Sequence, residues 1–166
     1  MKKYLISLLL FLTSISTWAQ ADSTQPPYKR FPTIPPVKLL LTDSVTYFTK
    51  ENFTKGSPAL IILFNPDCEH CKKETEELLD SINRFKNIQI VMATMMPFDM
   101  MKIFYEKFKL ADYKNITVGK DFQYFLPVFY KVSNLPYLAL YDKKGNLITT
   151  FEGAAPIHKV LEEFNK

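Results

Sequence analysis

Apolar residues recur along this chain in two patterns, which together predict an alternation of strands and helices. Short, nearly continuous apolar runs predict strands, whereas apolar residues spaced three or four apart predict helices that bury one face. The predicted strands are residues 37–41, 45–48, 59–64, 88–93, 137–141 and 146–151, and the predicted helices are residues 71–85, 97–110, 122–132 and 156–164. Residues 116–121 fit either a short strand or a loop. The chain is therefore expected to fold as an α/β protein.

The spacing of these elements predicts two hairpins and one β-α-β unit. Thr42–Ser44 separates the first two strands as a turn does, and Gly145, between the last two strands, can adopt positive φ. Residues 59–64 are apolar throughout, which suits a central strand that is covered on both faces. The helix and the strand that follow it complete the β-α-β unit. We therefore expect an α/β domain built around that strand.

The first residues have the three parts of a secretory signal peptide. Met1–Lys3 is positively charged, Tyr4–Leu12 is almost wholly apolar, and Thr17–Ala19 offers small residues where a signal peptidase cuts. We expect residues 1–19 to be removed before Gln20 and the protein to be exported, with the periplasm as its location. Secretion and retention through an uncleaved membrane anchor are the alternatives, although the apolar stretch is short for a transmembrane helix.

Composition divides the rest of the chain into two parts. Residues 20–36 are polar and rich in proline, which predicts an extended tether, and residues 37–166 form the predicted folded domain. The formal net charge of +4 falls to +2 when Lys2 and Lys3 leave with the signal peptide. So small an excess gives no reason to expect binding to nucleic acid. We expect a monomer.

The only two cysteines, Cys68 and Cys71, lie three residues apart, where the strand 59–64 gives way to a helix. Unpaired N–H groups at a helix N-terminus stabilise a thiolate, which is the form that attacks a disulfide. The helical stripe places Cys71 on the buried side and Cys68 nearer the exposed tip. A purely structural bridge would close a loop too small to restrain the unfolded chain much. The pair is therefore predicted to be a redox-active dithiol at the carboxyl end of a strand, where open α/β sheets usually have their reaction sites.

The order of elements resembles the thioredoxin fold, and two segments strengthen the resemblance. Val132–Tyr137 is similar to the segment that carries a cis-proline opposite the dithiol. Cys68–Glu74 is similar to the active-site run of exported TlpA/ResA-like thiol–disulfide oxidoreductases, or redoxins. The resemblance implies a thioredoxin-like domain with a mixed central sheet flanked by helices and an N-terminal β-hairpin. It also implies a cis bond before Pro136, which would shape the groove where a partner chain docks.

The resemblance also implies roles for single residues. Cys68 would attack a partner's disulfide, or be attacked, and Cys71 would resolve the mixed disulfide. In the TlpA/ResA-like group a glutamate follows the second cysteine at the same interval as Glu74, which makes Glu74 the candidate to exchange a proton with Cys71. The competing interpretation of Glu74 is a solvated carboxylate in an acidic run. We expect no cofactor and no metal site, and the expected partners are protein thiols and disulfides, with a membrane electron donor or acceptor among them.

Three positions depart from the pattern of this group. Asp67 stands where a tryptophan usually precedes the first cysteine, Ile62 where many thioredoxins bury an acid, and His70 where reductases often have proline. A protonated His70 favours the Cys68 thiolate, whereas Asp67 and Glu69 disfavour it by repulsion. These effects are similar in size, so the direction of electron flow is left open.

A rival function from another class is copper binding or copper delivery in the periplasm. Five methionines follow the dithiol in the sequence, and thioether sulfur together with thiolate is a ligand set that suits Cu(I), a soft ion. They are Met92, Met95, Met96, Met100 and Met101. Core packing on a strand and a helix explains the same residues without a metal.

Overall fold

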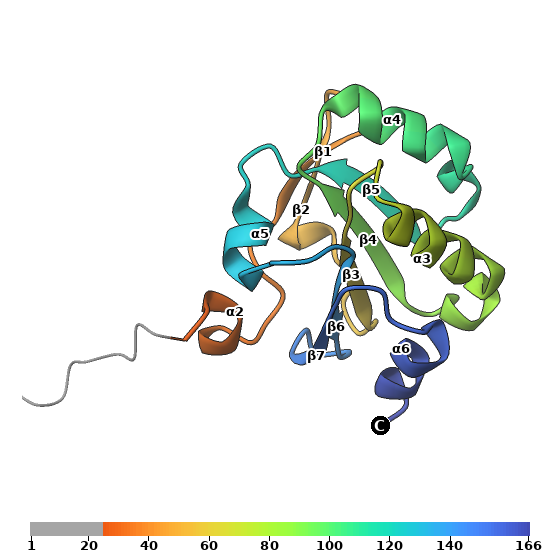
Figure 1. Ribbon diagram of the computed structural model, residues 1–166. Coiled ribbons are helices and arrows are strands. Elements are labelled where there is room, and N and C mark those ends of the chain that lie inside the picture. The colour runs from red at the N-terminus through yellow and green to blue at the C-terminus, as the bar shows by residue number, and fades with distance from the viewer. Residues whose placement is uncertain (1–24) are drawn as a thin grey trace, which may run out of the picture.

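Seven strands form one mixed sheet in the computed structural model, which describes residues 25–166 (Figure 1). Across the sheet the strands follow the order β2-β1-β5-β4-β3-β6-β7. They are β1 Lys38–Leu41, β2 Tyr47–Thr49, β3 Ala59–Leu63, β4 Gln89–Thr94, β5 Ile116–Lys120, β6 Tyr137–Tyr141 and β7 Leu147–Glu152. The neighbours β3, β4 and β5 are parallel, and the other pairs are antiparallel.

Helices cover both faces of this sheet (Figure 1). They are α2 Pro27–Arg30, α3 Glu69–Asp80, α4 Phe98–Lys107, α5 Phe125–Tyr130 and α6 Ile157–Phe164, and short 3₁₀ turns occur at Lys50–Asn52, Ile82–Phe85 and Leu110–Asp112. On one face α3, α4 and α6 pack over a first cluster of buried apolar side chains, and on the other face α5 and α2 pack over a second cluster. No helix within residues 25–166 has the length and apolar character to cross a membrane.

Strand β3 accounts for the continuous apolar run in the sequence. Its five residues are all buried. Leu60 and Ile62 belong to the first cluster, while Ala59, Ile61 and Leu63 belong to the second, because successive side chains of a strand point to opposite faces. Both faces of β3 are therefore shielded from water, and the residues that follow it continue directly from this buried strand.

The two hairpins, the β-α-β unit and the central position of β3 are confirmed. The undecided segment 116–121 forms strand β5, between β1 and β4. The helices are shorter than predicted. Helix α4 ends at Lys107, and Lys109 soon after it adopts the left-handed conformation, with φ of 48°. Helix α5 begins only at Phe125, so that Pro127 stands in its first turn, where the missing N–H of proline is not needed.

The described part of the predicted tether is not extended, which corrects that expectation. Pro27–Arg30 form α2, and the ring of Tyr28 packs on that of Tyr130 with 6.0 Å between their centroids. Further along, the N–H of Ile34 donates a hydrogen bond to a carbonyl of the β6–β7 turn at 2.9 Å, and Ile34 is buried. Apolar side chains of this proline-rich stretch join the second cluster, so the stretch belongs to the fold. The predicted signal peptide lies outside the described residues.

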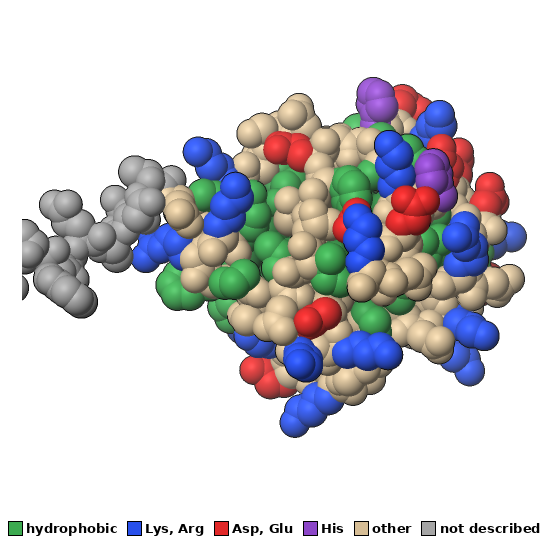
Figure 2. Space-filling model, turned by 90° about the horizontal axis from the view of Figure 1, so that it is seen from below, with side chains coloured by type: hydrophobic (Ala, Val, Ile, Leu, Met, Phe, Trp, Pro, Cys, Tyr) green, Lys and Arg blue, Asp and Glu red, His purple; other side chains and the backbone are tan. Residues whose placement is uncertain are grey.

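Charged side chains of both signs share the surface that is seen from below the view of Figure 1 (Figure 2). Lysine and arginine alternate there with acidic and hydrophobic groups. Such a mixture is usual for a solvated surface and singles out no charged ligand on this face.

Candidate active site

The dithiol lies at the carboxyl end of β3, where a tight turn leads into α3. The side-chain oxygen of Asn65 accepts a hydrogen bond from the N–H of Asp67 at 2.9 Å, and the C=O of Asn65 accepts the N–H of Cys68 at 3.0 Å. Asparagine favours such turns because its side chain mimics a backbone carbonyl. Cys68 is the N-cap residue of α3, and Cys71 lies in the first turn. Both sulfurs therefore lie near the positive end of the helix dipole.

The two thiols differ in their surroundings. Both cysteines are free, Cys68 is half-buried, and Cys71 is only 1% exposed. The N–H of Asn65 donates a weak hydrogen bond to Sγ of Cys71 at 3.5 Å. Burial nevertheless raises the pKa of Cys71 to about 12, against the lowering effect of the Asn65 N–H and with smaller contributions from the nearby Cys68 and Glu74. Cys71 is therefore a protonated thiol at neutral pH and needs a proton acceptor before it can react.

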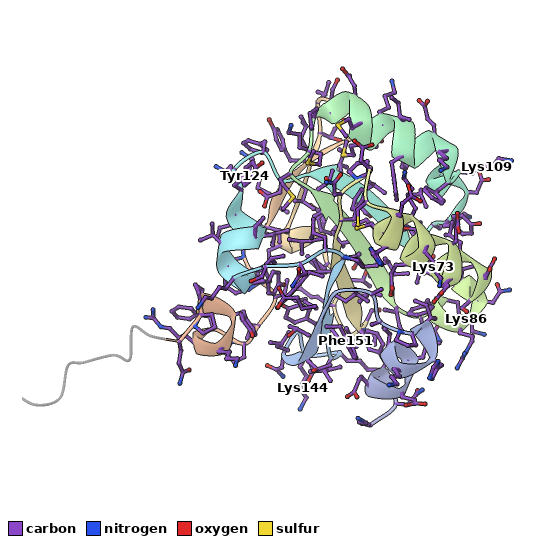
Figure 3. The ribbon with its side chains drawn as sticks, viewed as in Figure 1. Lys73, Lys86, Lys109, Tyr124, Lys144 and Phe151 are labelled. Atoms are coloured by element: carbon purple, nitrogen blue, oxygen red, sulfur yellow. The ribbon has the colours of Figure 1, made fainter. Side chains whose placement is uncertain are left out.

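Glu74 is buried one helical turn beyond Cys71. It is 4% exposed, whereas its neighbour Lys73 is exposed on α3 (Figure 3). Its Oε2 accepts the N–H of Ala155 at 3.0 Å, and its Oε1 has no hydrogen-bond partner within the part of the chain that the structure describes. Burial raises the pKa of Glu74 to about 7, against the effect of the Ala155 N–H and with a smaller contribution from Glu77. The interpretation of Glu74 as a solvated surface carboxylate is wrong, and the group can gain or lose a proton near neutral pH.

The other charged groups around the dithiol are at the surface. Asp67, Glu69 and His70 are exposed. Glu69 accepts a hydrogen bond from Nζ of Lys72 at 2.6 Å, and this bond lowers the pKa of Glu69. Water and salt screen charges in such positions, so each acts weakly on the sulfur of Cys68.

The loop before β6 lies opposite the dithiol. The Leu135–Pro136 peptide bond is cis, and Pro136 is buried. The C=O of Leu135 lies 4.0 Å from Sγ of Cys68, although the two are 67 residues apart in the chain. The C=O of Pro136 accepts the N–H of Gly153 at 2.9 Å. Glu152, directly before Gly153, accepts hydrogen bonds from two backbone N–H groups of this loop. No sequence pattern identifies this residue, because an acid at the end of a strand is common.

The methionines do not gather around the thiols as one group. Met92 and Met101 are fully buried in the first cluster, where they fill the core between the sheet and α4. Met95, Met96 and Met100 are half-buried. Within residues 25–166, no group of three or more His, Cys, Asp or Glu side chains is arranged to hold a metal ion.

A hollow of about 200 Å³ lies between the dithiol turn and α4. Asp67 and Lys72 line one side, and Met100, Ile103 and Lys107 are among the residues of α4 on the other. Two larger hollows, of about 440 and 340 Å³, lie along the connection between β2 and β3, and neither is lined by Cys68, Cys71 or Glu74. The hollow beside α4 thus borders the turn that carries the dithiol.

Comparison with known proteins gives one family and a set of related structures. The family model described as a thioredoxin-like domain matches residues 49–166. A search of curated proteins gives no match.

The related structures come from several bacteria. A secreted Mycobacterium tuberculosis disulfide oxidoreductase, homologous to DsbE of E. coli, is 18% identical, with a TM-score of 0.65 over 78% of this chain and 95% of that chain. DsbF of M. tuberculosis is 19% identical, with a TM-score of 0.67 over 80% and 98% of the two chains. StoA of Bacillus subtilis is 18% identical, with a TM-score of 0.56 over 78% and 97%. At these identities the likeness establishes the fold.

Proposed function

The chain belongs to the thioredoxin-like family, and from this premise we propose that it is an exported thiol–disulfide oxidoreductase acting on protein partners. One observation carries the proposal. The only two cysteines, both free, lie where a strand gives way to a helix, and one is half-buried while the other is buried beside a buried carboxylate. An accessible thiol with a protected second thiol behind it is what disulfide exchange needs.

The exchange has two steps. In the reducing direction, the Cys68 thiolate attacks one sulfur of the partner's disulfide, a bond forms between them, and the other sulfur leaves as a thiolate. Cys71 then loses its proton and attacks Sγ of Cys68, which forms the Cys68–Cys71 disulfide and releases the partner's second sulfur as a thiolate. The partner gains the two electrons that the dithiol loses. The reverse sequence oxidises a partner's dithiol.

Glu74 acts in the second step. The thiol of Cys71, with its pKa of about 12, holds its proton at neutral pH and reacts only if that proton has somewhere to go. Glu74 has a pKa of about 7, and the free lone pairs of its buried Oε1 can take the proton directly or through one water. In the reverse direction the same carboxyl returns the proton. His70 and Glu69, both exposed, adjust the stability of the Cys68 thiolate without touching the reacting atoms.

The partner's chain docks between Cys68 and the loop that carries Pro136, so that its sulfur meets Sγ of Cys68. A membrane protein that donates or accepts electrons would return the dithiol to its starting oxidation state between turnovers. The exported, periplasmic location rests on residues 1–19. Mass spectrometry of the protein taken from the cell envelope should therefore find a chain that begins at Gln20, whereas the mass of the uncut chain would indicate a retained anchor.

Copper binding through the same thiolates is the rival function, and an anaerobic Cu(I) titration separates the two. Met92 and Met101 are committed to the core, which removes them as surface ligands. If the protein acts by disulfide exchange, Cu(I) chelators of physiological affinity should remove all of the Cu(I) from it. Thiol turnover should persist. Tight Cu(I) binding that depends on Met95, Met96 or Met100, without turnover, would favour copper delivery instead.

Reduction of insulin by dithiothreitol, followed by the turbidity of the released chains, tests the proposed function. The wild-type protein should accelerate the reduction, because its dithiol passes electrons from the small thiol to the protein disulfide. The variant with both Cys68→Ser and Cys71→Ser serves as the control. A wild-type rate equal to that of the double variant would exclude the reducing direction. Oxidation of a reduced model protein is then tested with the same pair, and equal rates there as well would remove the proposed activity.

A further inference from the structure

Glu152 ends strand β7 and binds two consecutive backbone groups of the loop opposite the dithiol. Its Oε1 accepts the N–H of Ser133 at 2.6 Å and the N–H of Asn134 at 2.8 Å. One carboxylate oxygen thus holds two donors that come 18 and 19 residues earlier in the chain. Phe151, the preceding residue, packs against the first cluster near α6 (Figure 3), so strand alternation turns Glu152 away from that cluster.

The loop that Glu152 holds is the one that faces the nucleophile. Only one residue separates Asn134 from Pro136, and the intervening Leu135 points its C=O toward Sγ of Cys68. The N–H of Gly153 fixes the other end of the loop at Pro136. Leu135 packs against both apolar clusters, whereas Ser133 and Asn134 are exposed, so the bonds to Glu152 hold the exposed part of the loop.

The residues that follow Glu152 also contact the buried carboxyl near the second thiol. Two residues beyond Gly153, the N–H of Ala155 binds the carboxylate of Glu74, which is the proton acceptor proposed for Cys71. The end of β7 therefore holds the loop opposite Cys68 through Glu152, and the segment after β7 binds the carboxyl of Glu74 through the N–H of Ala155.

We propose that Glu152 is a positioning residue that holds the loop in the geometry in which a partner's chain meets Cys68. This inference rests on the proposed disulfide exchange. Hydrogen bonds from N–H groups to a charged oxygen are among the stronger ones in proteins, and without them the two N–H groups would turn to water and the loop would move. A mobile loop adds an ordering cost to partner binding and leaves the thiol chemistry itself unchanged.

Steady-state kinetics with a protein disulfide and with a small disulfide test this role. Glu152→Ala should raise KM for insulin about tenfold at nearly unchanged kcat, because an interaction that organises binding is lost. The rate with 5,5′-dithiobis(2-nitrobenzoate), which needs no docking loop, should stay at the wild-type value. Glu152→Gln should restore KM to near the wild-type value, since an amide oxygen also accepts both N–H groups. Glu106→Ala removes an exposed carboxylate from α4 and is the matched control.

Three results would overturn the positioning role: an unchanged KM in Glu152→Ala, an equal loss with both disulfides, or a Glu152→Gln variant as poor as the alanine variant. Amide hydrogen exchange provides a readout that needs no turnover. The N–H groups of Ser133 and Asn134 should be protected in the wild type and in Glu152→Gln, and should exchange freely in Glu152→Ala. Absent protection in the wild type contradicts the positioning role, whereas protected amides without any insulin turnover by the wild type contradict only the proposed function.

Discussion

Burial, more than local charge, sets the chemistry of the residues at this site. Cys71 is 1% exposed and Glu74 is 4% exposed, and the loss of water raises their pKa values to about 12 and about 7. The acidic and basic side chains nearest Cys68 lie at the surface, where solvent screens the effect of their charges on the sulfur. Substitutions at the buried pair should therefore affect the rate, and substitutions at the surface should adjust the redox potential.

Glu74→Gln should slow the resolution of the mixed disulfide at least about tenfold, because a positioned proton acceptor is commonly worth that much or more. In the wild type the resolution rate should rise with pH through about 7, as Glu74 ionises, and the glutamine variant should lack this rise. Stopped-flow measurement of single turnovers with a common disulfide substrate checks both points. Glu76→Gln, at an exposed position on the same helix, is the control. Equal rates for the two variants would end the role of Glu74 as proton acceptor.

His70→Ala should make the reduction potential of the dithiol more negative by tens of millivolts, where 30 mV corresponds to about 1.4 kcal/mol. The reason is that a positive imidazolium near Cys68 stabilises the thiolate of the reduced form. Equilibration with glutathione buffers measures the potential, and His158→Ala, on the exposed side of α6, should leave it unchanged.

At the scale of elements, the strands and the dithiol helix could be predicted from the sequence because each has a strong local pattern. The run 59–64 is apolar throughout, and Cys71 begins a clear helical stripe. What could not be predicted depends on contacts between distant segments. Glu74 stands in an acidic run, and only the docking of the segment before α6 buries it. In the proline-rich stretch before β1, Pro27–Arg30 form a short helix, and the ring of Tyr28 packs on that of Tyr130, about a hundred residues further along the chain. No local pattern in the sequence indicates such a distant partner.

The burial of Glu74 should also make stability depend on pH. The pKa of this carboxyl rises from the ordinary 4.5 to about 7 on folding, so the folded state holds the proton more tightly than the unfolded state. Its contribution to the free energy of unfolding is therefore fully present below about pH 4.5 and is lost as the pH rises to about 7, by about 3 kcal/mol at most.

Urea denaturation at several pH values measures this effect as a difference between variants, because other carboxyl groups of the chain have lowered pKa values and act in the opposite sense. Glu74→Gln should gain stability relative to wild type as the pH rises from about 4.5 to about 7. Glu76→Gln should follow the wild type throughout. A constant difference between Glu74→Gln and wild type over this range would mean that Glu74 is not held in a proton-retaining environment.

At the scale of the whole molecule, the sheet brings three separate parts of the chain to one place. The turn after β3 supplies the two cysteines, the loop before β6 supplies Pro136, and the end of β7 with the segment after it supplies the groups that bind that loop and Glu74. The first two of these meet because β3 and β6 are antiparallel neighbours, so that the end of β3 lies beside the start of β6. The result is a half-buried thiol at the surface with a buried thiol behind it. The proposed function depends on this difference, because the first thiol attacks and the second resolves the mixed disulfide.

Trapping of mixed disulfides tests the assignment of these two roles most directly. Cys71→Ser and Cys68→Ser are each exposed to a protein disulfide, and the adducts are resolved on non-reducing gels and identified by mass spectrometry. Cys71→Ser should accumulate a covalent adduct through Cys68, because the accessible thiol still attacks and nothing resolves the product. Cys68→Ser should accumulate almost none, because Cys71 is buried and protonated. Equal trapping by the two variants, or trapping through Cys71 alone, would contradict the assignment of Cys68 as the nucleophile.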